Sequence, residues 1–336
     1  MENVVVIVPN LNGMGSLEKC IDSVLAQSRK NILIVIENGS TDNSLAFLKK
    51  NFSNIEIVEN SKNLGFAGGV NQGIKKAIDQ GAEFVALLNN DAVAERDWLK
   101  KLIEVMDKSE DVGIVAPKIL STHEKQLDSV GDQYTSWGLP YPRGRKESDS
   151  RQYDKPEKIF SASGGASLCR VSMLKEIGLF DNDFFAYYED VDISFRAQLA
   201  GWKVLYEPSA VVYHEIGATS SKIPGFTTYQ TIKNLPWLFW KNVPFKYLLK
   251  VGVRFYFAYF SFIISALLRR QFGPVLKGVF VSTMLLPKKL VQRHKIQASS
   301  KVSPEYIWSI MTHDLPPNAT KLRKIRSFYH KLIKKA

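Results

Sequence analysis

Cysteine is scarce in this 336-residue chain, which has only Cys20 and Cys169, far apart in the sequence. Because the two match no metal-binding or redox spacing, the sequence excludes a disulfide-stapled secreted fold and favours a reducing compartment. A signal peptide is also missing from the start, since the short Val/Ile run after Asn3 stops at Pro9 and no basic region precedes it. We therefore expect a globular protein that is not exported.

Acidic residues are nearly absent from the last third of the chain. Residues 222–336 hold 21 Lys and Arg against two acids, Glu305 and Asp314, a net charge of +19. Residues 1–221 hold 24 basic and 31 acidic residues, a net charge of −7. Trp, Phe, Tyr and Leu are also crowded into residues 235–286. These shifts predict a boundary near residue 220, between a domain at 1–220 and a basic, apolar helical region at 221–336.

Short aliphatic runs alternate with amphipathic stretches through the first half. The expected strands are 4–8, 32–36, 55–58, 84–88 and 112–116, and the expected helices are 17–27, 44–51, 70–80 and 97–108. Unbroken aliphatic strands between helices predict an α/β fold with a mostly parallel sheet and helices on both faces.

Polar residues follow four of these strands. They are Pro9 and Asn10, the turn at 37–42, the segment 60–69, and the run 89–91. Because parallel sheets bind ligands outside the carboxyl ends of their strands, we expect these residues to meet at one binding edge.

Two common nucleotide-binding patterns fail. Gly13 and Gly15 follow the first strand, but Glu18 stands where a dinucleotide fingerprint needs its third glycine. The glycine spacing after the third strand is also wrong, and no Gly-Lys-Ser/Thr sequence of a P-loop is present. Ordinary NAD and ATP folds are therefore disfavoured.

The turn ENGSTDNS at 37–44 offers Glu37 at a strand tip, where its carboxylate can accept a hydrogen bond from a nucleobase. The alternative is a plain turn in which Ser40 or Asp42 caps the next helix. The glycine-rich segment at 63–73, NLGFAGGVNQG, lets the backbone approach a bulky ligand and directs a helix N-terminus at phosphate. Tight packing between helix and loop is its structural alternative.

Carboxylates suited to chemistry follow later strands. Asp91, after two asparagines, can hold a divalent cation whose coordination the ligand's diphosphate completes, although such a strand end is also a common turn. Helical periodicity after Tyr188 places Glu189 in a first turn beside an aromatic cluster. That arrangement suits a sugar hydroxyl that must lose a proton, and it equally suits an acid placed at a helix N-terminus. Asp192 and Arg196, four residues apart, predict an intrahelical ion pair.

In this order the segments resemble the family 2 glycosyltransferases, which have the GT-A fold, and most of all the branch that includes bacterial rhamnosyltransferases. The matching letters are VVVIVPNLN, ENGSTDNS, NLGFAGGVNQG, LLNNDA, SGGASLCR and FFAYYEDVDISFRAQLAGWKVLYEPSAVVYH, over about residues 3–217. The resemblance implies an inverting enzyme that uses a nucleotide-diphospho-sugar.

Site roles carry over by matching position. The resemblance implies that Asp190 is the catalytic base and that Asp91 and His214 bind Mg²⁺ or Mn²⁺, although a lone His is more often structural. The implied donor-binding residues are Pro9, Asn10, Glu37, Asn38, Gly39, Asp42, Asn63, Gly65, Asn71, Asn90 and Asp91, and the implied acceptor-binding residues are Gly165, Tyr187 and Glu189. Asn89 stands where the family has an acid and Glu37 where it has Asp, which leaves metal affinity and base preference open.

The C-terminal region carries two apolar stretches. Residues 251–268 would form a helix of about 27 Å, just short of a bilayer core and interrupted by Arg254. Residues 272–286 are broken by Pro274 and Lys277. Basic residues on every flank favour docking on an anionic membrane surface, at the cytoplasmic face, with aromatics at headgroup depth. The alternative is packing on the catalytic domain or on a second subunit in a homo-oligomer.

The sequence therefore predicts a membrane-associated, metal-dependent, inverting glycosyltransferase of polysaccharide biosynthesis. By resemblance, its donor is dTDP-rhamnose and its acceptor a polyprenyl-linked saccharide. The alternatives are a transferase of the same fold with a UDP-sugar, or a silent nucleotide-sugar binder. Nucleic acid is disfavoured as a partner, because the aromatics lie in apolar blocks and are not interleaved with the basic residues. Residues 118–160, rich in Gly, Pro, Tyr and charge, are expected to shape the acceptor side.

Overall fold

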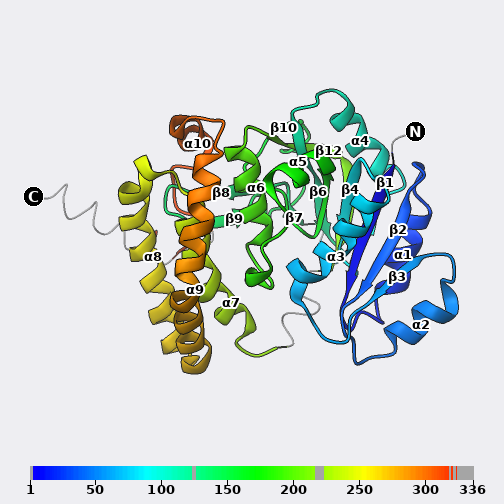
Figure 1. Ribbon diagram of the computed structural model, residues 1–336, viewed down its shortest axis with the longest axis horizontal. Helices are drawn as coiled ribbons and strands as arrows, with labels where there is room; N and C mark the ends of the chain where they lie inside the picture. The colour runs from blue at the N-terminus through cyan, green and yellow to red at the C-terminus, as the bar shows by residue number, and fades with distance from the viewer. Residues whose placement is uncertain (1–2, 123–125, 216–222, 318, 321–322, 324–336) are drawn as a thin grey trace, which may run out of the picture.

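The computed structural model describes residues 3–122, 126–215, 223–317, 319–320 and 323 (Figure 1). The strands are β1 (Val4–Asn10), β2 (Ile32–Glu37), β3 (Glu56–Glu59), β4 (Phe84–Leu88), β5 (Ala92–Ala94), β6 (Val112–Ser121), β7 (Leu127–Ser129), β8 (Asp132–Tyr134), β9 (Pro140–Pro142), β10 (Glu157–Lys158), β11 (Ala166–Arg170) and β12 (Lys203–His214). The α-helices are α1 (Leu17–Leu25), α2 (Ser44–Asn51), α3 (Gly65–Asp79), α4 (Trp98–Asp107), α5 (Val171–Ile177), α6 (Glu189–Leu199), α7 (Phe226–Asn242), α8 (Leu248–Leu268), α9 (Phe272–Ala298) and α10 (Pro304–Ile310), and short 3-10 turns are η1 (Asn182–Phe184) and η3 (Phe245–Tyr247).

A mixed, mostly parallel sheet organises the first two thirds of the chain. Its order is β10-β12-β6-β11-β4-β1-β2-β3, with β5 on β12 and β7 on β6. β3, β2, β1 and β4 are parallel, β11 runs antiparallel between β4 and β6, and β12 is parallel to β6. The predicted α/β class is confirmed. The carboxyl ends of β1, β2 and β4 meet at one edge of this sheet.

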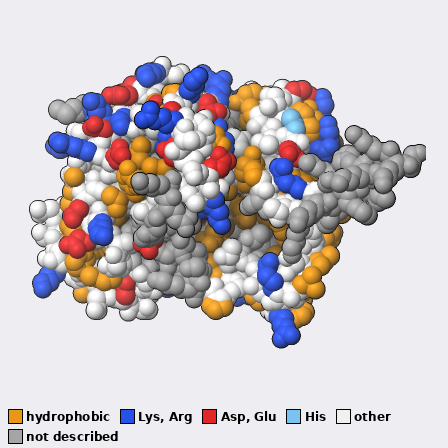
Figure 2. All heavy atoms as spheres, turned by 180° about the vertical axis from the view of Figure 1, so that it is seen from behind, with side chains coloured by type: hydrophobic (Ala, Val, Ile, Leu, Met, Phe, Trp, Pro, Cys, Tyr) orange, Lys and Arg blue, Asp and Glu red, His pale blue; other side chains and the backbone are white. Residues whose placement is uncertain are grey.

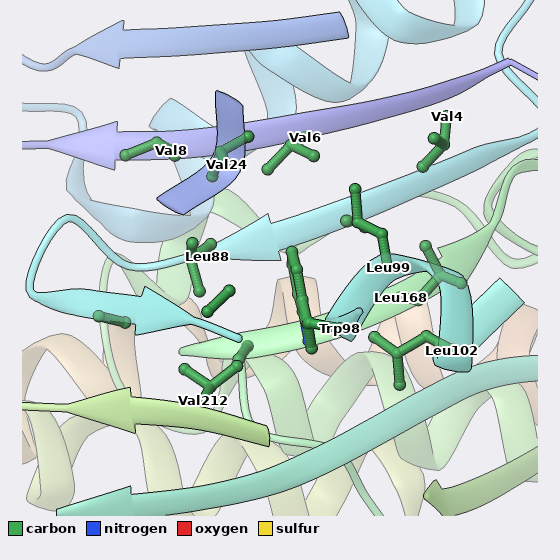
Figure 3. Close-up of a cluster of buried hydrophobic side chains, with 14 of the residues drawn as sticks. Val4, Val6, Val8, Val24, Leu88, Trp98, Leu99, Leu102, Leu168 and Val212 are labelled. Carbon is green, nitrogen blue, oxygen red and sulfur yellow. The ribbon is translucent and has the colours of Figure 1, made fainter. Parts of the chain in front are cut away.

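Alternate residues of β1 pack on opposite faces of the sheet, as strand geometry requires. Val4, Val6 and Val8 belong to the hydrophobic cluster that includes α1 and α4, whereas Ile7 belongs to the cluster that includes α3. Figure 3 shows the first cluster, in which Trp98 of α4 packs among side chains from β4, β11 and β12. Helices therefore cover both faces and hold the strand ends in place.

The glycine-rich segment is helical. α3 begins at Gly65, so Gly68 lies inside the helix and the predicted start at residue 70 was wrong. A Cβ added at Gly73 would lie 2.8 Å from Cγ2 of Ile7, so the helix can pack against β1 only because that side chain is missing. The structural alternative, tight packing, accounts for this glycine.

A third hydrophobic cluster joins the two halves of the chain. It includes Tyr134, Phe184 and Phe195 from the first half, and Trp237 and Phe255 from the C-terminal helices. The boundary near residue 220 stays a prediction, but this shared cluster means that α7 to α10 pack on the sheet-bearing part, as the alternative to membrane docking had it.

The helices of the C-terminal region are longer than the sequence indicated. α8 begins at Leu248 and has 21 residues, about 31 Å, instead of the 18 expected. α9 runs through Pro287 to Ala298, well beyond the predicted apolar stretch. Within the described residues, Phe245–Leu268 is the single segment long and apolar enough to cross a membrane by length and composition, and 33% of its most apolar window is buried in the protein.

Candidate active site

A cavity of about 700 Å³ opens at the carboxyl edge of the sheet. This volume lies within the usual range for sites that enclose small-molecule ligands. The predicted site residues that line it are Pro9, Asn10, Asn38, Asn63, Gly65, Asn90, Asp91, Gly165, Tyr187, Glu189, Asp190 and His214. Residues chosen from six separate sequence segments thus meet around one cavity.

Four predicted donor-binding residues lie outside this lining. Gly39, at φ +75°, provides a tight turn, because an added Cβ would lie 2.7 Å from the backbone of Lys62. Asp42 accepts hydrogen bonds from the backbone N–H groups of Ser44 and Met14. Burial acts to raise the pKa of Asp42, but these bonds outweigh it and hold the pKa below its ordinary value. Both residues therefore build the turn.

The other two residues outside the lining, Glu37 and Asn71, are buried and bonded within the protein. The side chain of Asn71 donates to the carbonyl of Phe180 (2.7 Å) and accepts from the backbone N–H of the same residue (3.0 Å). Glu37 accepts from Nδ2 of Asn10 at 2.6 Å, and Oδ1 of Asn10 accepts from Nδ2 of Asn90 at 2.7 Å. Glu37 thus lies behind the residues that line the cavity. Through its bond to Asn10 it orients the side-chain amides of Asn10 and Asn90.

His214 lies between two carboxylates beside the cavity. It ends β12, which pairs with β5 just after Asp91. Its Nε2 is 3.1 Å from Oδ1 of Asp91, and its Nδ1 is 2.8 Å from Oδ2 of Asp128. Burial acts to lower the pKa of His214, but the hydrogen bonds and charges of the two carboxylates outweigh it and raise the pKa to about 9.

The chemistry of this group fits a divalent cation. Oδ1 of Asp91 is buried, and among the described residues the only polar contact that the structure records for it is the ion-pair contact with Nε2 of His214, so it can still accept a ligand. A His whose second ring nitrogen faces a carboxylate, as His214 faces Asp128, is the usual arrangement of a metal-binding imidazole. The described residues contain no cluster of three or more His, Cys, Asp or Glu that could hold a metal ion without help from a ligand. Asp91 and His214 can therefore supply only part of a coordination shell.

Asp190 lies where the amino end of α6 meets the cavity. Its Oδ2 accepts from the backbone N–H of Gly164 (2.9 Å), and its Oδ1 accepts from the backbone N–H of Val191 (2.8 Å). Burial raises the pKa of Asp190 above its ordinary value, against the opposing effect of these backbone bonds. Both oxygens are thus fixed in orientation, as a proton-accepting group requires.

Two further carboxyl groups adjoin Asp190. Burial, reinforced by the charge of Asp190, raises the pKa of Glu189 well above its ordinary value. The same two causes raise the pKa of Asp132 to about 7, although Ser129 donates a hydrogen bond to it at 2.9 Å. Burial, together with the repulsion between the three carboxyl groups, therefore favours the protonated forms of Glu189 and Asp132.

The loop before α6 is strained. Phe185, Tyr187 and Tyr188 have φ values of 65°, 70° and 71°, a region that costs non-glycine residues roughly 1–3 kcal/mol each. Gly65 of α3 makes room for this loop, since an added Cβ would lie 2.4 Å from the carbonyl oxygen of Phe185. On the other side, Nδ2 of Asn234 in α7 bonds to three of the loop's carbonyl groups. The C-terminal helices therefore hold the loop that leads into Asp190 in shape.

Buried ion pairs strengthen the same connection. Asp192 of α6, fully buried, pairs with Arg196, which confirms the predicted intrahelical pair. Asp192 also pairs with Lys241 of α7 at 2.9 Å, and Asp181 pairs with both Lys241 and Lys289 of α9 at 2.8 Å. Because buried charges are costly without partners, the two halves of the chain depend on each other.

The cavity residues that the sequence analysis did not single out include three charged ones, Asp128, Asp132 and Arg145. They come from the region of β7, β8 and β9, strands of three residues each that carry no readable periodicity. The sequence did place residues 118–160 near the acceptor without assigning roles. Arg145 donates to Oδ1 of Asp128 at 2.6 Å, which adds a cation next to the His214 group.

Comparison with known proteins identifies relatives of this chain by sequence and by structure. The chain is 27% identical over 228 residues to an N-acetylglucosaminyl-diphospho-decaprenol L-rhamnosyltransferase of Mycobacterium tuberculosis, over 62% of this chain and 74% of the relative. Among solved structures, S. aureus TarS 1–349 in complex with UDP matches 92% of this chain and 90% of its own, with a TM-score of 0.52 and 16% identity. A mannosyltransferase from Pyrobaculum calidifontis, in complex with GDP-Man and Mn²⁺, matches 91% and 87%, with a TM-score of 0.53 and 14% identity.

The structural likenesses show the fold, and the sequence match shows the family. The family model described as glycosyl transferase family 2 matches residues 5–178, just over half of the chain. That range includes β1 to β4 and the Asp91 strand end. The chain therefore belongs to glycosyl transferase family 2 and is a glycosyltransferase.

Proposed function

We propose that this glycosyltransferase moves a sugar from a nucleotide-diphospho-sugar to a hydroxyl group of a saccharide acceptor, with inversion at the anomeric carbon. One observation carries the proposal: the carboxylate of Asp190 and the Asp91–His214 pair line the same cavity at the carboxyl edge of the sheet. Proton acceptance and diphosphate binding can therefore act on one bound sugar.

Asp190 is the base in this proposal. Its carboxylate takes the proton of the acceptor hydroxyl as that oxygen bonds to the anomeric carbon. The bond from the anomeric carbon to the diphosphate oxygen breaks in the same step, and its electron pair leaves with the nucleoside diphosphate. Glu189 is less suited to the role, because its raised pKa favours the neutral form. A neutral carboxyl can instead donate a hydrogen bond to the acceptor.

A divalent cation, Mg²⁺ or Mn²⁺, would be held by Asp91 and His214. When bound, it would stabilise the negative charge that develops on the leaving diphosphate. Asp128 keeps the ring of His214 in place through Nδ1, so that Nε2 faces the site. Asn89, in place of an acid, lies with its amide 3.4 Å from Nε2 of His214 and adds no charge.

We further propose rhamnose from dTDP-rhamnose as the donor sugar and a lipid-linked saccharide as the acceptor, with a UDP-sugar as the alternative donor. The name of the M. tuberculosis relative supports this pairing, since it is a rhamnosyltransferase for a diphospho-decaprenol-linked sugar. Arg145 and Lys146 line the cavity and suit a second diphosphate, and Ile223 and Phe226 add apolar wall.

The test is thermal unfolding of the full chain with dTDP, UDP, GDP and NAD, each with and without Mn²⁺. A ligand at 100 times its dissociation constant stabilises the folded state by about 2.7 kcal/mol. We expect a Mn²⁺-dependent rise with dTDP, and a larger rise with UDP would identify the alternative donor. The absence of stabilisation by every nucleoside diphosphate would overturn the proposal.

A further inference from the structure

Exposed hydrophobic side chains are concentrated on α8 and α9. Of the 19 large hydrophobic residues that are exposed in the described part of the chain, 14 lie between Phe245 and Val291. Single exposed hydrophobic residues need no explanation, but a contiguous apolar patch on a folded protein marks an interaction surface. Figure 2 shows hydrophobic and basic side chains together along the edge of the molecule that these helices form.

On η3 and α8, which follow each other directly, these residues form one stripe. They follow each other at three- and four-residue steps, which keeps them on one side of the helix: Phe245, Leu249, Val253, Phe257, Phe260, Ile264 and Leu268. Val251, Phe255 and Ala266, on the opposite side, are buried against the protein. α8 therefore has one apolar face packed on the protein and a second apolar face that is open.

α9 repeats the pattern beside α8. Its exposed residues again fall on one side: Phe272, Leu276, Val279, Phe280, Met284, Leu290 and Val291. Its buried residues include Val275, Gly278 and Ser282, and the carbonyl group of Ser282 accepts a hydrogen bond from the indole of Trp237 in α7. The two helices run antiparallel, joined by a short turn (Figure 1). We call the 14 exposed residues the apolar face.

The segment that carries the apolar face has charges of a single sign. Residues 245–298 contain ten Lys and Arg and no Asp or Glu. Of these, Lys289 is buried in an ion pair, and Lys246 and Lys288 pair with acids of other segments. Arg269 and Arg270, both exposed, form the turn between Leu268 and Phe272, which are 79% and 56% exposed. Lys277 is exposed next to Leu276. An apolar stripe with basic neighbours complements a surface that is apolar inside and anionic outside.

We propose that the apolar face docks on the surface of a bilayer that contains anionic lipids. Its side chains enter the boundary between headgroups and acyl chains, and its Lys and Arg side chains meet the headgroup charge. A second copy is a poor occupant, because a two-fold contact would bring the same cations together. Crossing the bilayer is also disfavoured, since the inner side of α8 is fixed to the protein: Phe255 stacks on Phe239 at 4.8 Å, and Tyr259 donates to the carbonyl of Ile232 at 2.9 Å.

The experiment is co-sedimentation of the full chain with vesicles of phosphatidylcholine alone, or with 30% phosphatidylglycerol. We expect binding to the anionic vesicles that is at least tenfold tighter than to the neutral ones and that weakens with added salt. The variant Leu268→Glu with Leu276→Glu should lower the affinity for anionic vesicles at least tenfold. Leu25→Glu, a matched change at a 53% exposed leucine of α1, should leave it unchanged.

Three outcomes would overturn the proposal. One is equal sedimentation with and without vesicles. Another is undiminished binding by the double Glu variant, which would place the contact in a different basic part of the chain. The third is a dimer in solution that the double variant converts to a monomer, which would show that a second copy covers the apolar face. These readouts need no donor sugar, so a failure here is distinct from a failure of the proposed function.

Discussion

Asn234 donates a hydrogen bond from its side-chain amide to the carbonyl oxygen of Tyr187 at 2.9 Å. The same nitrogen lies within 3.0 Å of the carbonyl oxygens of Phe184 and Ala186, in a loop that carries left-handed residues. Asn234 is fully buried in α7, which belongs to the basic C-terminal region. It acts as a positioning residue, since it holds the backbone that leads directly into Glu189 and Asp190.

Asn234→Leu is expected to lower kcat about tenfold to a hundredfold, because small misplacements of a catalytic group cost that much. The part-buried carbonyl groups of Ala186 and Tyr187 would also lose this donor, at about 1–3 kcal/mol each at most, whereas the carbonyl of Phe184 keeps its bond from Lys233. Nucleotide affinity should change less than threefold, since the donor side of the cavity is untouched. Steady-state kinetics with a binding titration separates the two effects. Thr228→Val, in the same helix but bonded to Gln271 just before α9, is the control, and a lower melting temperature of the Asn234 variant with unchanged kcat would refute the positioning role.

Lys241→Met should destabilise the protein by about 3–5 kcal/mol, because it leaves the buried carboxylates of Asp181 and Asp192 short of a partner. Lys246→Met, the matched control, removes a lysine from an exposed pair with Glu305 and should leave stability nearly unchanged. Urea denaturation, followed by circular dichroism, gives both values. If residues 221–336 formed an independent unit, the Lys241 variant would instead show two transitions, with the first half unaffected.

Asp132→Asn is expected to change how stability depends on pH. The folded protein holds the pKa of Asp132 at about 7, above the value of an unfolded chain, so ionisation opposes folding. The stability that this group contributes is complete below about pH 4 and is lost as the pH rises through 7. The free energy of unfolding of the variant should therefore rise relative to that of the parent as the pH increases from 4 to 7, by at most about 4 kcal/mol. Parallel curves for parent and variant would contradict the raised pKa, and Asp107→Asn, on exposed α4 surface, is the control.

Asp128→Asn is expected to weaken Mn²⁺ binding about tenfold to a hundredfold, as the loss of a carboxylate behind a metal-binding His usually does. Titration of the full chain with Mn²⁺ alone, followed by electron paramagnetic resonance, measures this directly. Arg145→Gln tests the other partner of Asp128 and should leave Mn²⁺ affinity nearly unchanged. Equal affinity in the parent and the Asp128 variant would show that His214 is not held for a metal.

The sheet-bearing half could be predicted well from the sequence, because buried parallel strands consist of uninterrupted runs of aliphatic residues. The strand at 84–88 and the helix at 44–51 have the predicted bounds. The start of α3 was predicted too late because a helix interior with several glycines is unusual. One of these glycines, Gly73, is needed for the contact of the helix with Ile7, and the sequence does not show such tertiary contacts. Proximity of Asp91 and His214 was implied by family resemblance alone, since 122 residues separate them.

The missed features depend on contacts between distant segments. In the sequence, Lys241 and Lys289 were counted among the charges of a basic C-terminal region. In the structure, both are buried against Asp181. Asn234 carries no sequence signal, because a single asparagine within an apolar helix does not reveal which carbonyl groups it meets. Asp128 and Asp132 lie on strands too short to show a period.

The central claim is that Asp190 accepts the proton of an acceptor hydroxyl. The most direct measurement is transfer of labelled sugar from dTDP-rhamnose and UDP-sugars to a lipid-linked saccharide, by the parent and by Asp190→Asn, with nucleotide affinity measured on both. Asn can still accept a hydrogen bond but cannot take up the proton. The account predicts loss of transfer by at least a thousandfold with affinity within a few-fold. Transfer by Asp190→Asn at the rate of the parent would contradict it.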